Sequence, residues 1–196
     1  MKVNRLHHLG IFDEDFIRGK TPMTKREVRI LSLNEAKIEE NSVVYDIGAG
    51  TGSLSVEAAL LAPSVKVYAI EKNSEGVELI KQNAKKFNVK NIEVLNKTAP
   101  DGMDELPFAD VILIGGSGGE VAKILKISLE KLKQNGRIVI NTVTIETLYE
   151  TIAYLKKRSE INYYFYEVAI NRYFKTGKYH LKKSENPISI IVVNKK

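Results

Sequence analysis

Short runs of β-branched residues alternate with helix-length segments along most of the chain, and this alternation leaves few possible folds. A strand, a helix and a second strand in succession form a βαβ unit. Right-handed crossovers place such strands in one parallel sheet with helices on both faces. Ligands then bind beyond the carboxyl ends of the strands. The predicted strands are 43–47, 65–70, 92–95, 110–114 and 137–141, and the predicted helices are 53–62, 74–87, 119–133 and 145–157.

The pattern changes after the last predicted helix. Residues 163–170 and 187–193 are two further apolar runs with no helical segment between them, so we expect an antiparallel pair that closes the sheet. The predicted fold class is α/β: a doubly wound, Rossmann-like, seven-stranded and mostly parallel sheet with an antiparallel last strand. A chain of 196 residues is long enough for one well-buried domain, and we expect residues 1–196 to form one.

One more helix is predicted ahead of the first strand. Thr24 and Glu27 have the spacing of a capping box, in which the hydroxyl and the carboxylate bind free N–H groups at the start of a helix. Pro22 prevents an earlier start. We expect this helix to end at about Lys37.

The segment Asp46-Ile-Gly-Ala-Gly-Thr-Gly52 stands between the first predicted strand and its helix. Gly48 permits a sharp turn, Gly50 lets a ligand approach the backbone, and Gly52 lets the helix pack close to the strand. The spacing departs from the dinucleotide fingerprint G-x-G-x-x-G, because Ser53 stands where the last glycine is required. No lysine follows that would make a phosphate-binding loop.

Two carboxylates indicate which ligand this turn binds. Asp46, at the expected mouth of the turn, would repel a pyrophosphate and suits a ligand that carries an ammonium and a sulfonium charge. Glu71 ends the second predicted strand, 71 − 48 = 23 residues after Gly48, where an acidic side chain can accept both hydroxyls of a ribose. The predicted cofactor is S-adenosylmethionine.

These residues resemble those of class I S-adenosylmethionine-dependent methyltransferases. Three further segments, 12–25, 114–120 and 186–190, look like the cobalt-precorrin-6B methyltransferase (decarboxylating) family of cobalamin biosynthesis, and the likeness covers the chain from end to end. This resemblance implies methylation of carbon 15 of the reduced macrocycle, with loss of carbon dioxide from the acetate on carbon 12. The cofactor contacts that it implies are Thr24, Gly48, Ala49, Gly50, Thr51, Gly52, Glu71 and Ala99.

The resemblance also implies an assembly and a cellular context. It implies that residues 1–37 form an extension and a helix that cover the cofactor site, that the protein is a homo-oligomer, a tetramer, and that a carbon 5 precorrin methyltransferase is a possible partner. The chain has no cysteine, hence no disulfide, and we expect a cytoplasmic protein. No segment approaches the ~20 apolar residues that span a bilayer, so no membrane partner is expected.

Residues 115–119, Gly-Gly-Ser-Gly-Gly, follow the fourth predicted strand. They bring one hydroxyl and no general base. A carbon nucleophile in an electron-rich macrocycle needs none, while glycines admit a broad, flat substrate and their N–H groups can cradle a carboxylate. A tight strand-to-helix turn is the competing interpretation. The candidate substrate loop is therefore Gly115, Gly116, Ser117, Gly118 and Gly119.

The basic excess of the chain lies at its carboxyl end. The net charge is +6, and residues 156–196 hold ten Lys and Arg against three Asp and Glu. A tetrapyrrole with many acetate and propionate groups would suit such a surface. A metal site is not expected, because His7 and His8 are adjacent and His180 stands alone. The candidate carboxylate ligands are Arg18, Lys20, Arg172, Lys175, Lys178, His180, Lys182 and Lys183.

Three alternatives remain open at this point. The basic residues can be an ordinary solvated surface. A tRNA or RNA base methyltransferase would use the same basic region, with Tyr173, Phe174 and Tyr179 for base stacking, although the glycine loop offers no side chain to read a base. A regulator that binds S-adenosylmethionine without catalysis would share the fold. The tetrapyrrole hypothesis accounts for most of these features, and it includes no nucleic-acid partner.

Overall fold

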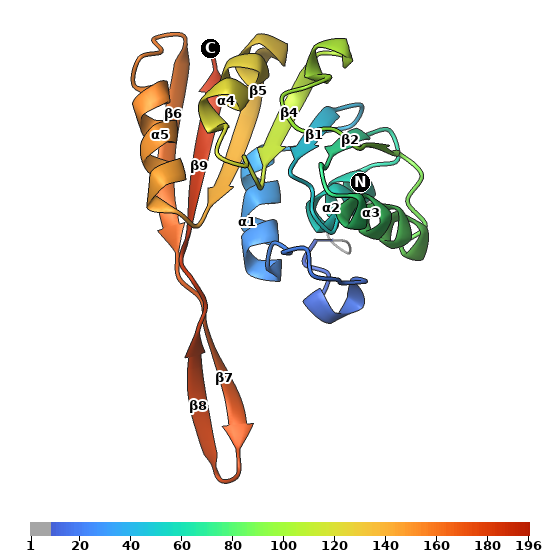
Figure 1. The fold of residues 1–196 in the computed structure, drawn as a ribbon, viewed down its shortest axis with the longest axis vertical. Helices are drawn as coiled ribbons and strands as arrows, with labels where there is room; N and C mark the ends of the chain where they lie inside the picture. The colour runs from blue at the N-terminus through green and yellow to red at the C-terminus, as the bar shows by residue number, and fades with distance from the viewer. Residues whose placement is uncertain (1–8) are drawn as a thin grey trace, which may run out of the picture.

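Within the part of the chain that the computed structural model describes, residues 9–196, seven strands form one central sheet (Figure 1). The strand order is β3-β2-β1-β4-β5-β9-β6, and β1 to β5 run parallel. This confirms the predicted α/β fold class. The strands are β1 (Val43–Ile47), β2 (Lys66–Ile70), β3 (Ile92–Leu95), β4 (Ala109–Ile114), β5 (Leu132–Thr142), β6 (Ile161–Val168) and β9 (Ile188–Lys195).

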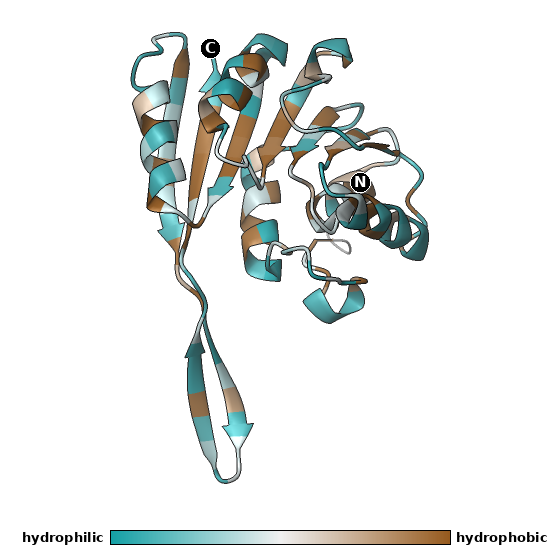
Figure 2. Cartoon of the chain, in the orientation of Figure 1, coloured by the Kyte–Doolittle hydropathy of each residue, from teal (hydrophilic) through white to brown (hydrophobic). Residues whose placement is uncertain are grey.

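The helices cover the two faces of the sheet and enclose two apolar cores. Successive residues of a strand point to opposite faces, so in β4 Ile112 belongs to the core under α4 and α5, and Leu113 to the core under α1 and α2. Figure 2 shows the apolar residues concentrated on the central strands. The helices are α1 (Arg26–Ala36), α2 (Ser53–Leu61), α3 (Ser74–Lys86), α4 (Val121–Lys131) and α5 (Ile145–Leu155).

The carboxyl-terminal strand is antiparallel, as the sequence predicts. β9 pairs with β5 on one side and with β6 on the other, antiparallel in both cases. It is therefore an interior strand, and β6 forms the edge of the sheet.

A hairpin between β6 and β9 was not predicted. β7 (Asn171–Thr176) and β8 (Tyr179–Ser184) form a separate two-stranded sheet, here called the arm (residues 171–184), that extends away from the body (Figure 1). Every residue of both strands is exposed. The arm escapes prediction because no face of it is buried in the chain's own core, so the usual alternation of apolar and polar residues is weak.

The predicted capping box at the start of α1 is wrong. The N-cap is Lys25, and no side chain caps the helix through Thr24 or Glu27. The backbone N–H of Arg26 donates instead to Asp13 Oδ1 at 3.0 Å. Glu27 accepts two hydrogen bonds from Arg172, at 2.9 and 2.7 Å. A bidentate guanidinium–carboxylate pair is stronger than a bond from a neutral backbone amide, which explains why this long-range pairing prevails.

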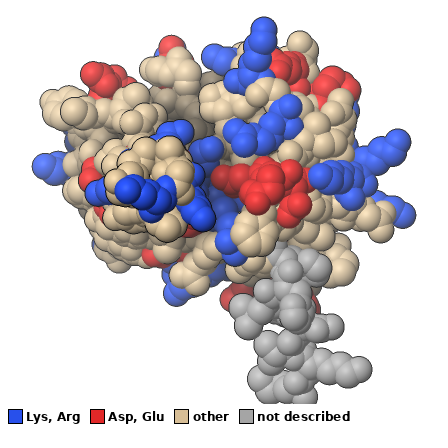
Figure 3. Space-filling model, turned by 90° about the horizontal axis from the view of Figure 1, so that it is seen from below, with Lys and Arg blue, Asp and Glu red and all other residues tan. Residues whose placement is uncertain are grey.

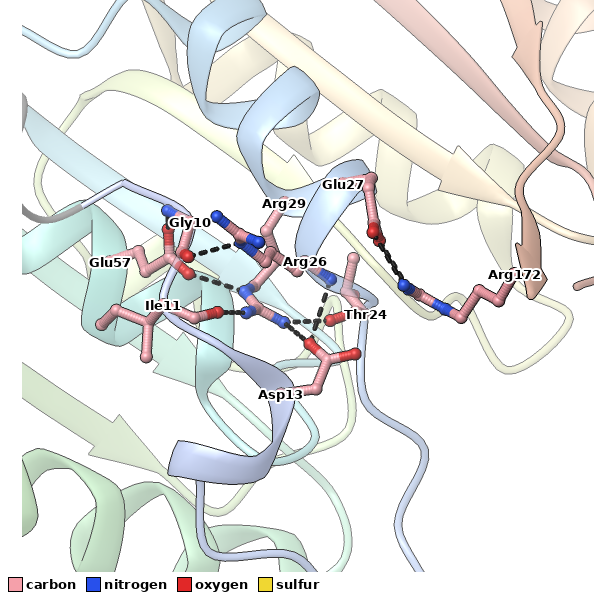
Figure 4. A network of polar contacts seen from close by, with 9 residues as sticks. All are labelled: Gly10, Ile11, Asp13, Thr24, Arg26, Glu27, Arg29, Glu57 and Arg172. Carbon is pink, nitrogen blue, oxygen red and sulfur yellow. Dashed lines mark hydrogen bonds and ion pairs between the residues drawn. The ribbon is translucent and has the colours of Figure 1, made fainter. Parts of the chain in front are cut away.

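The buried guanidinium of Arg29 ties the amino-terminal segment to the body (Figure 4). Its Nε donates to Glu57 Oε1 and one Nη donates to Asp13 Oδ1, both at 2.8 Å. It also donates to the backbone carbonyls of Ile11 and Thr24, each at 2.5 Å. The remaining oxygen of Glu57, Oε2, accepts the N–H of Gly10 at 2.7 Å. Because the charge is fully enclosed, each partner is needed to offset its desolvation.

Arg29→Ala is therefore expected to lower the free energy of unfolding by about 3–5 kcal/mol, because it leaves Glu57 buried without its counter-charge. Urea unfolding followed by circular dichroism measures the change. Arg158→Ala, at an exposed site where the nearest carboxylate is 3.9 Å away, is the control and should cost well under about 1 kcal/mol. Equal effects of the two substitutions would show that the Arg29 cluster does not stabilise the protein.

Candidate functional site

A pocket of about 570 Å³ opens at the carboxyl ends of β1, β2 and β4. These ends meet because parallel strands finish at the same edge of a sheet. The volume lies within the range of small-molecule sites. Its lining comes from residues 21–25, 48–50, 70–73, 97–99, 115–118, 141–143 and 185–186, together with Val28, Glu120, Ile124, Ile170 and Ile188.

The floor of the pocket is a close contact between two backbones. Gly48 has φ of +68°, and a Cβ atom at this position would lie only 2.6 Å from the carbonyl oxygen of Gly116. The N–H of Gly115 donates to the carbonyl of Ile47 at 2.9 Å, which holds the two loops together. A glycine at position 48 is thus required by both its conformation and its neighbour.

The amino-terminal segment passes over this floor. A Cβ atom on Gly50 would lie 2.9 Å from the carbonyl oxygen of Pro22. Asn83 of α3 fastens the segment: it accepts the N–H of Ile17 at 2.7 Å and donates to the carbonyls of Ile17 and Thr51. The segment that precedes α1 is therefore one wall of the pocket.

The carboxylate of Glu71 shapes the turn from below. It is buried and accepts the N–H of Gly50 at 2.9 Å through Oε2 and the N–H of Asn73 at 2.8 Å through Oε1. A carboxylate has about four acceptor positions, so both oxygens keep one for hydroxyl groups of a ligand. Glu71 lines the pocket, and its position suits a sugar with two adjacent hydroxyls.

The structure brings together most of the residues that the sequence singles out. Thr51 and Gly52 are exceptions, because they lie against α3: Asn83 bonds the carbonyl of Thr51, and a Cβ atom on Gly52 would meet Ile80 at 3.0 Å. Gly119 also lies outside the lining. The predicted residues that line the pocket are Thr24, Gly48, Ala49, Gly50, Glu71, Ala99, Gly115, Gly116, Ser117 and Gly118.

Comparison with known proteins shows the family of this chain. The model of the precorrin methyltransferase domain matches residues 15–195. A protein of Sulfurisphaera tokodaii, "Probable cobalt-precorrin-6B C(15)-methyltransferase (decarboxylating)", is 40% identical over 93% of this chain and 95% of its own length. The chain belongs to the precorrin methyltransferase family.

Solved structures of relatives have the same fold over nearly the whole chain. The precorrin-6y C5,15-methyltransferase of Geobacter metallireducens superposes with a TM-score of 0.90 at 35% identity, over 95% of this chain and 97% of that one. A precorrin 8W decarboxylase of Methanobacterium thermoautotrophicum gives 0.86 at 32% identity, over 93% and 98%.

The basic residues expected at the site of this family member lie elsewhere. Arg172 pairs with Glu27 at 2.7 Å and lies 3.7 Å from Glu185, and it does not line the pocket. The same holds for the other candidates on the arm and for Arg18 and Lys20. The lysines that do line the pocket, missed by the sequence argument, are Lys25, Lys72 and Lys97.

A local signal could have found two of these lysines. Lys25 directly follows Thr24, and Lys72 directly follows Glu71, so each stands beside a predicted cofactor contact. The clustering of basic residues in 172–183 favoured that segment instead.

Among residues 9–196, no group of three His, Asp or Glu side chains is placed to hold a metal ion. No helix in this range has both the length and the apolar character needed to cross a membrane. His7 and His8 lie outside the described residues.

Asp46 is not at the mouth of the turn, which corrects the sequence interpretation. Its carboxylate is 1% exposed and lies beneath the turn, where Oδ2 accepts the hydroxyl of Ser55 at 2.5 Å. Burial raises the pKa of Asp46 to about 6; hydrogen bonds from Ser55 act in the opposite direction, and the charge of Glu71 raises the pKa further. Because β1 is enclosed on both faces, its side chains point into the protein rather than into the pocket.

The raised pKa predicts a pH-dependent effect of Asp46→Asn. In the folded state Asp46 keeps its proton up to about pH 6. In the unfolded state it loses the proton near its ordinary pKa of 3.8. The stability that this proton contributes is therefore complete below pH 3.8 and is lost as the pH rises through 6. Relative to wild type, the variant should gain up to about 3 kcal/mol between pH 4 and pH 8.

Urea unfolding at both pH values measures this gain. Asp101→Asn, at an exposed position, controls for the loss of a carboxylate. A difference between wild type and Asp46→Asn that is constant with pH would contradict the assignment.

Proposed function

We propose that this protein methylates carbon 15 of cobalt-precorrin-6B with S-adenosylmethionine and removes carbon dioxide from the acetate on carbon 12, a step of cobalamin biosynthesis. One observation carries the proposal: a glycine turn, a buried acid suited to a ribose and a loop poor in side chains meet in one pocket. They do so in a chain that is 40% identical, over 93% of its length, to a relative named for this reaction.

The residues present fit S-adenosylmethionine. Glu71 keeps acceptor positions for both ribose hydroxyls. Gly48, Ala49 and Gly50 line the pocket, and Ala99 gives a small apolar surface for the adenine. Thr24 comes from the segment that passes over the turn, and Val28 of α1 also lines the pocket. We therefore assign to residues 9–37 the role of covering the cofactor; residues 1–8 of the predicted extension lie outside the described part of the chain. The cofactor supplies an electrophilic methyl group.

The chemistry requires positioning more than acid–base groups. S-adenosylmethionine, when bound, would supply a methyl group to carbon 15 of the macrocycle and leave as the neutral thioether. The conjugated imine system of the substrate would accept the electron pair that the departing carbon dioxide leaves. Two carboxylates line the pocket near the loop: Glu120, paired with Lys123 at 2.7 Å, and Glu185, which lies near Arg172. The protein holds the two reactants in register, which is worth about 7–11 kcal/mol in favourable cases.

Anaerobic incubation with labelled S-adenosylmethionine and cobalt-precorrin-6B tests the proposal. Mass spectrometry should find a product that is heavier by the labelled methyl group and lighter by carbon dioxide. Glu71→Ala should abolish product formation and weaken binding of S-adenosylhomocysteine, because the ribose hydroxyls lose their acceptor. Recovery of unchanged tetrapyrrole with active cofactor binding would refute the assignment.

RNA methylation has no comparable support. A solved tRNA (m1A58) methyltransferase of Aquifex aeolicus resembles the chain at 18% identity, which shows the fold alone. A regulator without catalysis would leave the glycine loop without a purpose. We therefore retain neither alternative.

The protein is proposed to be a homotetramer joined through the arm. A two-stranded hairpin is marginally stable in isolation, yet here all strand residues are exposed. From the pairing register, Phe174, Leu181 and Tyr179 share one face of the arm. Their exposed fractions are 48%, 48% and 63%, and another copy of the chain would cover this face.

Phe174→Glu is expected to reduce the assembled mass in analytical ultracentrifugation, because it places a charge in the apolar face. Lys175→Glu, on the opposite face of the arm, is the matched control and should leave assembly intact. A wild-type protein that sediments as a monomer at micromolar concentration would overturn this part of the proposal.

Two further assignments complete it. We place the protein in the cytoplasm because it lacks cysteine. A carbon 5 methyltransferase is proposed as a partner, since the Geobacter metallireducens relative is named for methylation of both carbons.

A further inference from the structure

The lysines of the pocket differ in whether an acid neutralises them. Lys25 is the N-cap of α1, Lys72 follows β2, and Lys97 follows β3. Lys97 Nζ lies 3.3 Å from Glu105 Oε2. Within residues 9–196, the ammonium groups of Lys25 and Lys72 have no hydrogen-bond acceptor or carboxylate partner.

No acid of the pocket forms an ion pair with either lysine. Glu120 pairs with Lys123 and Glu185 lies near Arg172, while Glu71 keeps its own charge but accepts only backbone N–H groups. The ammonium groups of Lys25, which is half-buried, and Lys72, which is exposed, can therefore pair with an anionic ligand in the pocket.

The two lysines lie on different segments that line the pocket. Lys25 belongs to the segment whose Pro22 carbonyl lies over Gly50 of the glycine turn. Lys72 reaches the loop of residues 115–118, where its Nζ would be 3.4 Å from a Cβ atom on Gly118. Figure 3 shows basic side chains gathered in the hollow between the arm and the body of the molecule.

Building on the proposed function, we propose that Lys25 and Lys72 each bind a carboxylate side chain of the tetrapyrrole and so fix its position over residues 115–118. Lysine suits this task because a flexible point charge can follow acetate and propionate groups of varying orientation. Two anchors on separate segments restrict rotation of a flat ring, whereas one would leave it free to turn. S-adenosylmethionine also carries a carboxylate, so the test must separate the two sources.

Lys25→Gln and Lys72→Gln are compared with Lys90→Gln, which removes the same charge at an exposed position outside the pocket. Each pocket variant is expected to raise KM for cobalt-precorrin-6B, and the equilibrium Kd of the tetrapyrrole, by roughly ten-fold or more. Affinity for S-adenosylhomocysteine should not change. Lys72→Arg should recover part of the loss, because it restores the charge.

A tetrapyrrole whose carboxylic acids are methyl esters provides a second test. Wild type and both variants should bind it equally, because the anionic groups are gone. A variant equal to Lys90→Gln towards the acid substrate would overturn the inference, and so would a loss confined to S-adenosylhomocysteine. Tetrapyrrole binding is measured without turnover, so it tests the two lysines even if no methylated product forms. Absence of that product refutes the proposed reaction and not the role of the lysines.

Discussion

The enclosed ion pair between Arg29 and Glu57 is the interaction on which the site depends. It joins α1 to α2, and through Asp13, Gly10 and the carbonyls of Ile11 and Thr24 it holds the amino-terminal segment in place. A guanidinium with no exposed surface is tolerated only where its donors find acceptors. The same set of bonds therefore both stabilises the fold and forms one wall of the pocket.

Glycine backbone forms much of the remaining pocket wall, because these positions carry no side chain. Gly48 and Gly116 bring two backbones into contact at the carboxyl edge of the sheet, and Glu71 holds the turn through the N–H of Gly50. A larger residue at position 48 would fill this contact. The result is a pocket wall of glycine backbone with few side chains, among them Lys25, Lys72 and Lys97. This arrangement suits a reaction in which the substrate supplies the nucleophile and the electron sink, and the enzyme supplies orientation.

Charge is divided between two parts of the molecule. The arm carries most of the basic excess of the carboxyl end, but its residues do not line the pocket. Arg172, at the start of the arm, forms an ion pair with Glu27. The pocket has its own cations in Lys25 and Lys72. Phe174, Tyr179 and Leu181 lie exposed on one face of the arm, as the proposed interface requires.

The sequence by itself determined the fold class, the five parallel strands and the glycine turn, because these depend on local periodicity and on conformations open only to glycine. It also brought Glu71 to the pocket, since this residue directly follows β2 and parallel strands end at the same edge of the sheet. Tertiary structure decided what depends on distant partners. In the folded chain Asp46 lies beneath the turn, Glu27 pairs with Arg172 instead of forming a capping box, and the arm is a separate hairpin. Such outcomes are set by burial and by contacts between residues up to 145 positions apart, and no local pattern contains them.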